Sequence, residues 1–110
     1  VEDTVELAFC GDTCIDVIHN EPMVRKARAL ILEVTFMDDR VSVEKARRTG
    51  HMHLDEVIEN AEYFENEVLL FTHFSSRYRG QDIQRILAER LPNCLKGRVI
   101  ACLPDGTWVD

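Results

Sequence analysis

The chain has 110 residues, a formal net charge of −7 and a hydrophobic fraction of 45%, which fits one domain, residues 1–110, with a single core. The acidic balance argues against broad electrostatic attachment to nucleic acid but leaves room for a metal enzyme acting on phosphodiesters, because bound divalent cations change the local field. No apolar run is long enough to span a bilayer and no signal-peptide pattern is present, so we expect no membrane association.

Four cysteines stand at positions 10, 14, 94 and 102, without any C-x-x-C pair. Two of them lie in or beside predicted strands, so we expect the cysteines to be reduced and mostly buried. Reduced thiols are typical of a cytosolic or organellar interior. The sequence therefore predicts a cytoplasmic protein, with an organelle or the nucleus as the alternative.

Four short apolar runs, each bounded by polar or turn residues, predict β-strands. They cover residues 5–9, 29–36, 68–72 and 97–103. Short helices are predicted after Thr13, from Pro22, and over residues 43–48, where Ser42 can cap the helix. A clear amphipathic helix is predicted over residues 54–64, and a last helix between Gly80 and Pro92. Residues 37–40 are interpreted as a polar loop in which the two aspartates form a solvated turn.

The order of these elements is β-α-β-α-α-β-α-β, which predicts an α/β protein with a largely parallel sheet and right-handed crossovers. The strands are apolar on both sides, as in a sheet that is covered on both faces. The helices are too few to provide all of this cover. We therefore expect one face of the sheet to pack against something absent from this chain.

Polar side chains follow the predicted strands, at the edge where the carboxyl ends of parallel strands meet. Asp12 follows the first strand, Glu33 lies near the end of the second, and His73 follows the third. His51 and His53 begin the amphipathic helix, on the loop that returns to the same edge. Carboxylate and imidazole groups that converge at one edge can form a zinc site or carry out general acid–base catalysis.

Each of these residues also has a structural interpretation. Asp12 could be a turn aspartate near a helix cap, and His73 could bond a neighbouring backbone group. His51 and His53 could be a capping pair on the surface. Glu33 is harder to explain in this way, because an acid inside an apolar strand must be paired or functional.

Four short segments carry a resemblance to a known family. They are residues 9–13 (FCGDT), 32–38 (LEVTFMD), 50–54 (GHMHL) and 72–78 (THFSSRY). In this order they resemble successive motifs of tRNase Z (ribonuclease Z), the metallo-β-lactamase-fold endonucleases that remove 3′ trailers from precursor tRNA. The match covers residues 5–80 and is closest to the short plant and cyanobacterial type. Each motif alone is weak, but four in order are specific.

The resemblance implies roles for individual residues. Asp12 matches the aspartate that bridges two zinc ions, and His73 matches a histidine ligand of one of them. Glu33 and His51 match a glutamate–histidine pair that handles protons, the histidine helping the departing 3′ oxygen. A carboxylate orients an imidazole and favours its protonated form, and two Zn²⁺ ions activate a water and stabilise charge on the phosphate. His53 remains an alternative to His51, because many family members have His-Ser-Thr where this chain has His-Met-His.

Several family features are absent from this chain: the His-x-His-x-Asp-His motif that supplies most zinc ligands, a further histidine ligand, and the arm that grips the tRNA elbow. The resemblance therefore implies the carboxyl-terminal half of a metallo-β-lactamase αββα sandwich, cut from something longer. The expected partners are the missing amino-terminal half of the same enzyme, precursor tRNA and a second copy in a homodimer.

The expected function is that of a zinc-dependent tRNA 3′-end processing endoribonuclease, with two Zn²⁺ ions in a complete site and the isolated chain inactive. One alternative keeps the fold and changes the substrate to a small phosphodiester or ester. The other is a non-catalytic α/β module that binds a partner through an uncovered sheet face. No residue is assigned to substrate binding, and Arg77 is given no catalytic role.

Overall fold

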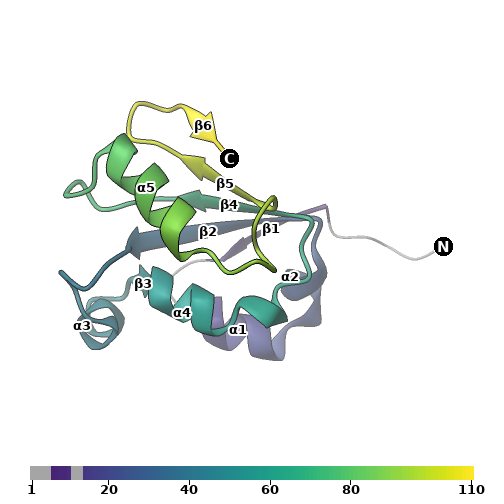
Figure 1. Ribbon diagram of the computed structural model, residues 1–110. Coiled ribbons are helices and arrows are strands. Elements are labelled where there is room, and N and C mark those ends of the chain that lie inside the picture. The colour runs from purple at the N-terminus through teal and green to yellow at the C-terminus, as the bar shows by residue number, and fades with distance from the viewer. Residues whose placement is uncertain (1–5, 11–13) are drawn as a thin grey trace.

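The computed structural model describes residues 6–10 and 14–110, apart from the side chains of residues 14, 15 and 17. Within these residues, one six-stranded sheet has the order β1-β2-β4-β5-β6, and β3 pairs with the carboxyl end of β2 (Figure 1). The strands are β1 (Leu7–Cys10), β2 (Ala29–Phe36), β3 (Met52–His53), β4 (Val68–Thr72), β5 (Val99–Cys102) and β6 (Trp108–Val109). The helices are α1 (Cys14–Asn20), α2 (Pro22–Lys26), α3 (Val43–Arg48), α4 (Leu54–Glu59), the 3₁₀ helix η1 (Ala61–Tyr63) and α5 (Gly80–Arg90).

The sheet is mostly parallel: β6 is antiparallel to β5, and the other pairs are parallel. The predicted class is confirmed at the level of a mixed α/β domain. The predicted order was incomplete, because it lacked β3 and β6 and counted as one helix the two short helices, α1 and α2, that were predicted between the first two strands. Strands β3 and β6 have two residues each, and so short a segment shows no period in the sequence.

Helix α3 begins at its predicted capping residue, the cap predicted at Thr13 lies outside the described residues, and one helix ends early. Ser42 caps α3, its hydroxyl accepting a hydrogen bond from the backbone N–H of Lys45 at 3.1 Å. The helix predicted over residues 54–64 stops at Glu59 and continues as η1. Asn60 ends it, because its side-chain amide donates to the Glu56 carbonyl at 2.8 Å and competes with the backbone ladder.

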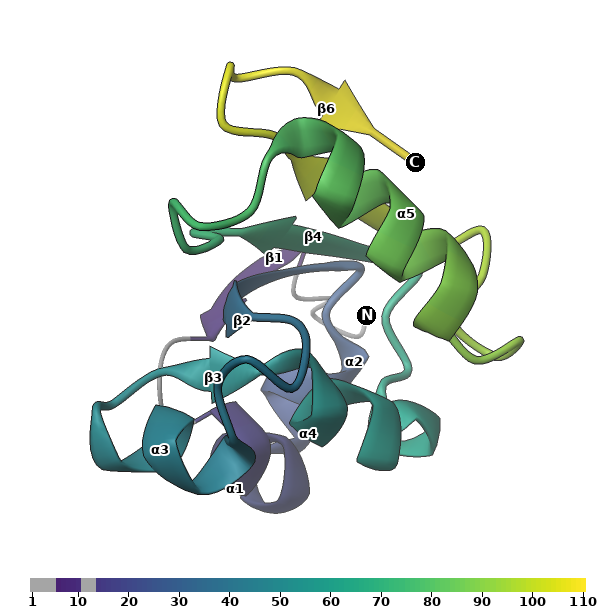
Figure 2. The ribbon, with the colours of Figure 1, turned by 60° about the vertical axis from the view of Figure 1, so that its left-hand side comes forward.

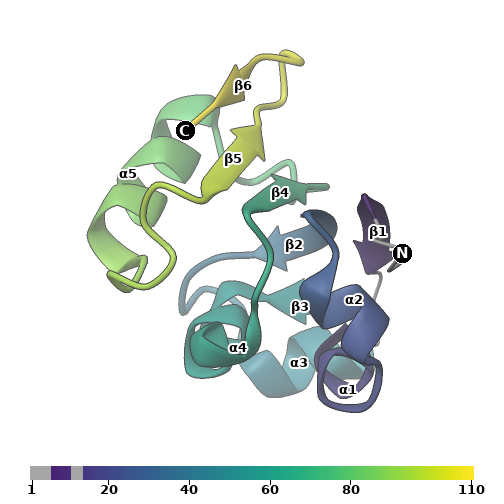
Figure 3. The same ribbon diagram turned by 90° about the vertical axis from the view of Figure 1, so that its right-hand side faces the viewer.

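One face of the sheet packs against helices and holds the core. Its fully buried residues include Leu30, Leu32, Leu69 and Phe71. Helices α4 and α5 lie against this face and bury Val57 and Ile83, among others (Figures 2 and 3). Burying each such apolar side chain contributes about 1.5–3 kcal/mol. The alternation of buried and less buried residues along β2 and β4 follows from the two-residue period of a strand.

The opposite face is much more open. A row of apolar side chains crosses four strands in register, from Phe9 through Ile31 and Leu70 to Ile100. Phe9 is 62% exposed, its neighbour Leu7 is 58% exposed, and the other three are half-buried. We call these five residues the open face. Its exposure agrees with the expectation of a face that packs against something outside this chain, which stays a prediction.

Two further expectations concern membrane crossing and the state of the cysteines. In the part of the chain that the structure describes, no helix has the length and apolar character needed to cross a bilayer. The thiols of Cys94 and Cys102 are free, but Cys94 is exposed. Cys10 is buried and disulfide-bonded, so the expectation of reduced cysteines is wrong at this residue. No local pattern pointed to this disulfide, because such a bond needs only spatial proximity and not a C-x-x-C spacing.

Candidate functional site

A pocket of about 370 Å³ lies at the carboxyl ends of β1, β2 and β4, where ligands are expected in an α/β sheet. It is lined by Phe9, Glu33, Thr35, Gly50, His51, Met52 and His73. Three of the four residues assigned from the sequence, Glu33, His51 and His73, are therefore brought together. A larger cavity of about 790 Å³ lies between α5 and the β5–β6 hairpin, but it contains none of the assigned residues. We place the candidate site in the smaller pocket, because carboxylate and imidazole groups converge there.

His73 directly follows β4 and has an unusual backbone. Its φ is 62°, in the left-handed region that residues with a side chain rarely adopt. Its Nδ1 lies 3.5 Å from Thr35 Oγ1 and 3.7 Å from Glu33 Oε2. Such a conformation persists where surrounding contacts impose it, and it is common at functional sites. The turn at His73 brings the imidazole back over the end of β2.

His51 reaches the same pocket from the loop before β3. Gly50, with φ 77°, turns the chain at the end of α3, and the His51 N–H donates to the Ala46 carbonyl at 2.8 Å. The imidazole lies edge-on to the Phe36 ring, with 5.7 Å between ring centroids, and 6.4 Å from the centroid of the His73 ring. The two imidazoles are thus neighbours across the pocket, although one comes from the α3–β3 loop and the other from the end of β4.

Glu33 lies on β2 and its side chain is about one-third exposed at 32%. The resemblance pairs Glu33 with His51. In the structure, the imidazole within 4 Å of its carboxylate is that of His73. Glu33 and His51 both line the pocket, but no hydrogen bond or ion pair joins these two described residues. Glu33 is therefore placed to orient His73, and it shares the pocket with His51.

His53 lies outside this pocket, in the core. Its side chain is 1% exposed, and its Nε2 lies 2.8 Å from both the Asp38 and the Val41 carbonyl oxygens. Its Nδ1 accepts a hydrogen bond from the Asp55 N–H at 3.0 Å and caps α4. This pattern requires the neutral tautomer with the proton on Nε2. The predicted surface capping pair is therefore wrong in two respects, since His53 caps α4 from within the core and His51 lines the pocket.

Metal ligation was the other expectation for this edge of the sheet. Asp12, the predicted bridging ligand, lies outside the described residues. Among the described residues, no group of three or more His, Cys, Asp or Glu side chains is arranged to hold a metal ion. His73 nevertheless suits zinc, which takes imidazole nitrogen and carboxylate oxygen as ligands. Metal-bound histidines direct their second nitrogen to an oxygen partner, and the position of His73 Nδ1 beside Thr35 and Glu33 leaves Nε2 for such a role.

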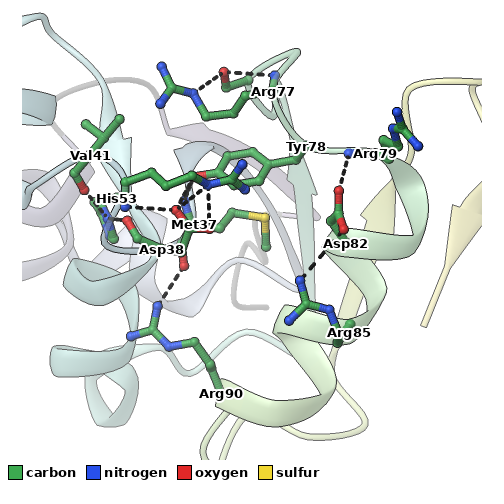
Figure 4. A network of polar contacts seen from close by, with 12 residues as sticks. Met37, Asp38, Val41, His53, Arg77, Tyr78, Arg79, Asp82, Arg85 and Arg90 are labelled. Carbon is green, nitrogen blue, oxygen red and sulfur yellow. Dashed lines mark hydrogen bonds and ion pairs between the residues drawn. The ribbon is translucent and has the colours of Figure 1, made fainter.

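Sequence reasoning missed a polar network behind the pocket (Figure 4). The buried Tyr78 hydroxyl accepts a hydrogen bond from the Met37 N–H at 2.9 Å and donates to Asp38 Oδ1 at 3.1 Å. Arg90 Nη1 donates to the Met37 carbonyl at 2.7 Å, and its Nη2 pairs with the Asp55 carboxylate. The solvated turn predicted for residues 38–39 is right for Asp39 and wrong for the half-buried Asp38, whose partner Tyr78 stands 40 residues further along the chain.

The network changes the pKa values of its two central groups. Burial raises the pKa of Asp38, but hydrogen bonds from the Arg40 backbone N–H, the Tyr78 hydroxyl and the Arg40 side chain outweigh it, so that the pKa is lowered overall. Burial raises the pKa of Tyr78, and its bond to the Asp38 carboxylate adds to this effect. Both shifts favour an ionised Asp38 that accepts from a neutral Tyr78.

Comparison with known proteins agrees with the motifs. The chain is 46% identical over 100 residues to tRNase Z TRZ1 of Arabidopsis thaliana, covering 89% of this chain and 35% of that protein. It is 37% identical over 106 residues to tRNase Z TRZ2, chloroplastic, of the same plant, covering 91% of this chain and 29% of that protein. It is 44% identical over 87 residues to ribonuclease Z of Pyrobaculum aerophilum, covering 77% of this chain and 29% of that protein. No family model matches the chain.

These similarities cover at least 77% of this chain, and three residues that the resemblance singles out, Glu33, His51 and His73, line one pocket. The chain belongs to the tRNase Z (ribonuclease Z) family. It spans about a third of the length of the curated relatives it matches.

Proposed function

We propose that this chain supplies part of the active site of a zinc-dependent endoribonuclease that removes the 3′ trailer from precursor tRNA. The observation that carries the proposal is the single pocket that gathers Glu33, His51 and His73 from β2, the α3–β3 loop and the end of β4. Similarity to proteins named tRNase Z and ribonuclease Z supplies the reaction and the substrate class.

Asp12 and His73 are the residues of this chain that would hold zinc. His73 suits this role because Thr35 and Glu33 occupy the surroundings of Nδ1 and so fix the orientation of the ring. Two Zn²⁺ ions would supply an activated water and would stabilise charge on the scissile phosphate. The remaining ligands would come from outside this chain.

Glu33 and His51 would handle protons. His51 lies at the pocket, half-buried and packed on Phe36, so its imidazole can carry a proton to a departing 3′ oxygen. Glu33 lines the same pocket and supplies a carboxylate that can accept a proton. His53 is a poor candidate for this task, because both of its ring nitrogens are engaged in the core.

The remainder of the enzyme would cover the open face. Phe9 and Leu7 on β1 are more than half exposed, and apolar exposure of this kind across four strands in register is typical of an interaction surface. A second sheet packed on this face would give the αββα sandwich of the metallo-β-lactamase fold. Homodimerisation of the complete enzyme is part of the same proposal.

The test is reconstitution. This chain replaces the matching 100 residues of tRNase Z TRZ1, and the chimera is assayed on precursor tRNA with Zn²⁺. We expect release of the 3′ trailer by the chimera and none by the isolated chain. Asp12→Ala and His73→Ala should abolish metal-dependent cleavage and lower zinc content, and His73→Gly, which suits the positive φ, should do the same.

Glu33→Ala should lower the cleavage rate while zinc stays bound. His19→Ala and Glu67→Ala are matched controls, because both side chains are exposed and lie outside the pocket lining. Unchanged turnover and zinc content in the Asp12 and His73 variants would refute the assignment of ligands. Loss of zinc in Glu33→Ala would mean that Glu33 is a ligand.

A second candidate is a non-catalytic module that binds a partner through the open face, and the exposure of Phe9 and Leu7 favours it. The two candidates differ in one outcome. A chimera that folds and retains its partner surface, but leaves precursor tRNA and a small phosphodiester uncut, would support the module and exclude the enzyme. Cleavage of the small phosphodiester alone would indicate a related hydrolase with another substrate.

A further inference from the structure

Three segments that carry site residues continue beyond the pocket into the polar network of Figure 4. Strand β2 carries Glu33 and leads into Met37 and Asp38. Strand β4 leads through His73 to Tyr78. The third segment carries His51 and leads into His53 on β3. The network therefore links segments that follow each of the three pocket residues in the chain.

Tyr78 connects the loop after His73 to the end of β2 through hydrogen bonds. Its ring is 1% exposed, and its hydroxyl lies between the Met37 N–H and the Asp38 carboxylate at 2.9 and 3.1 Å. The Arg40 guanidinium lies over the ring, 4.7 Å from its centroid. Within the loop, the Tyr78 N–H donates to the Ser75 carbonyl at 3.1 Å.

Two further contacts transmit this attachment to the pocket. The Ser75 N–H donates to the Thr35 carbonyl at 2.9 Å, which ties the loop to β2 two residues after His73. The Asp38 carbonyl accepts from His53 Nε2 at 2.8 Å, which ties the same region to β3 two residues after His51. Asp38 thus has its carboxylate bonded to one segment and its carbonyl to another.

The backbone of His73 explains why such an attachment is needed. A φ of 62° at a residue with a full side chain is strained and persists only where the surroundings impose it. The side chain of His73 is 59% exposed, so packing of the imidazole supplies little of this restraint. The restraint comes instead from the backbone on both sides of His73, since Thr72 pairs with Glu33 in the sheet and the loop that follows is bonded to β2 through Ser75.

We propose that Tyr78 is a positioning residue, whose hydroxyl holds the 73–79 loop on β2 and thereby keeps His73 in its left-handed conformation beside Thr35 and Glu33. This inference rests on the proposed function for its effect on catalysis, but its structural part concerns this chain alone. Tyr78 therefore acts on the binding of the ligand that His73 would hold. It affects the position of His51 less, because the hydrogen bond between His53 and the Val41 carbonyl also restrains β3.

The variant Tyr78→Phe removes one hydroxyl and keeps the buried ring. Tyr63→Phe is the matched control, because Tyr63 is 47% exposed and lies on η1, outside the pocket lining. In this chain, NMR would measure the imidazole ¹⁵N shifts of His73 and His51 at fixed pH and amide hydrogen exchange at Ser75. We expect displaced His73 shifts and about tenfold faster exchange at Ser75, with His51 and the amides of β5 nearly unchanged. Tyr63→Phe should leave all of these values as in the wild type.

In the TRZ1 chimera, Tyr78→Phe should lower kcat about tenfold with an almost unchanged KM, since the substrate still binds while the ligand is misplaced. Ile86→Val, a core change of comparable stability cost on α5, separates positioning from stability: it should leave kcat unchanged. Wild-type His73 shifts and Ser75 exchange in Tyr78→Phe would overturn the inference, and so would an equal fall of kcat in Ile86→Val. If the wild-type chimera does not cleave, the proposed function fails, whereas the NMR measurements still decide the role of Tyr78.

Discussion

Replacing His53 by alanine removes a buried ring that joins three parts of the chain. The imidazole donates from Nε2 toward the Asp38 and Val41 carbonyls and accepts from the Asp55 N–H with Nδ1. After the substitution, two carbonyls and the first turn of α4 lose their partner. The perturbation therefore acts mainly on stability and on the loop of residues 37–42, and it removes none of the side chains that line the pocket.

The size of the effect follows from these contacts. Loss of an N-cap costs about 1 kcal/mol. Two buried carbonyls that lose a shared donor cost about 1–2 kcal/mol. The cavity left by the ring adds to both, so His53→Ala should lower the free energy of unfolding by about 3 kcal/mol or more. For a domain of this size the corresponding fall in Tm is about 12 °C.

The assay is thermal unfolding of this chain followed by circular dichroism, with His51→Ala as the matched control. The His51 ring is half-buried and contacts Phe36 and His73 edge-on or tilted, so its removal should change stability by less than about 1 kcal/mol. In the chimera, activity is compared at a temperature at which both variants are folded. There the ranking of the two variants reverses, and His51→Ala should lose far more activity than His53→Ala. Equal Tm values for His53→Ala and the wild type, or activity lost mainly at His53, would refute this division of roles.

The remaining predictions concern pH and the open face. The pKa of Asp38 is lowered by folding, so its contribution to stability is complete above its ordinary pKa of about 4 and is lost as pH falls through the lowered value. Asp38→Asn should therefore flatten the acid limb of a stability–pH curve, whereas Asp39→Asn, at an exposed residue, should not. The pKa of Tyr78 is raised, so its contribution is complete below about pH 10 and is lost as pH rises through the raised value; an alkaline limb unchanged in Tyr78→Phe would contradict this. Leu7→Ser on the open face should weaken association with the rest of a tRNase Z by about tenfold without changing the Tm of the chain. Met23→Ser, at a similarly exposed residue on α2, should have no effect. Association that is insensitive to Leu7 would exclude this face as the interface.

The outline of the fold was readable because strand and helix signals are local. The apolar runs at residues 29–36 and 68–72 became β2 and β4 with these bounds, and Gly80 and Pro92 enclosed α5. Strands β3 and β6 were missed because they exist only through their pairing with β2 and β5. The helix predicted to run to residue 64 ended at Asn60, whose side chain competes for a backbone carbonyl.

The candidate site followed partly from the sequence. Parallel strands deliver their carboxyl ends to one edge, so it could be inferred from chain order that Glu33 and His73 lie at the same edge of the sheet. Two histidines separated by one residue could not be told apart in the same way. The structure separates them, since His51 lines the pocket while His53 is buried two residues later.

The sequence by itself determined the α/β class, the strand-end position of the polar residues and the family resemblance, because each depends on neighbours along the chain or on the order of motifs. Only the tertiary structure decided which imidazole faces the pocket, that Glu33 approaches His73, and that Asp38 is a partner of Tyr78 and not a solvated turn. These features depend on contacts between residues about 40 positions apart, and no local pattern in the chain specifies them.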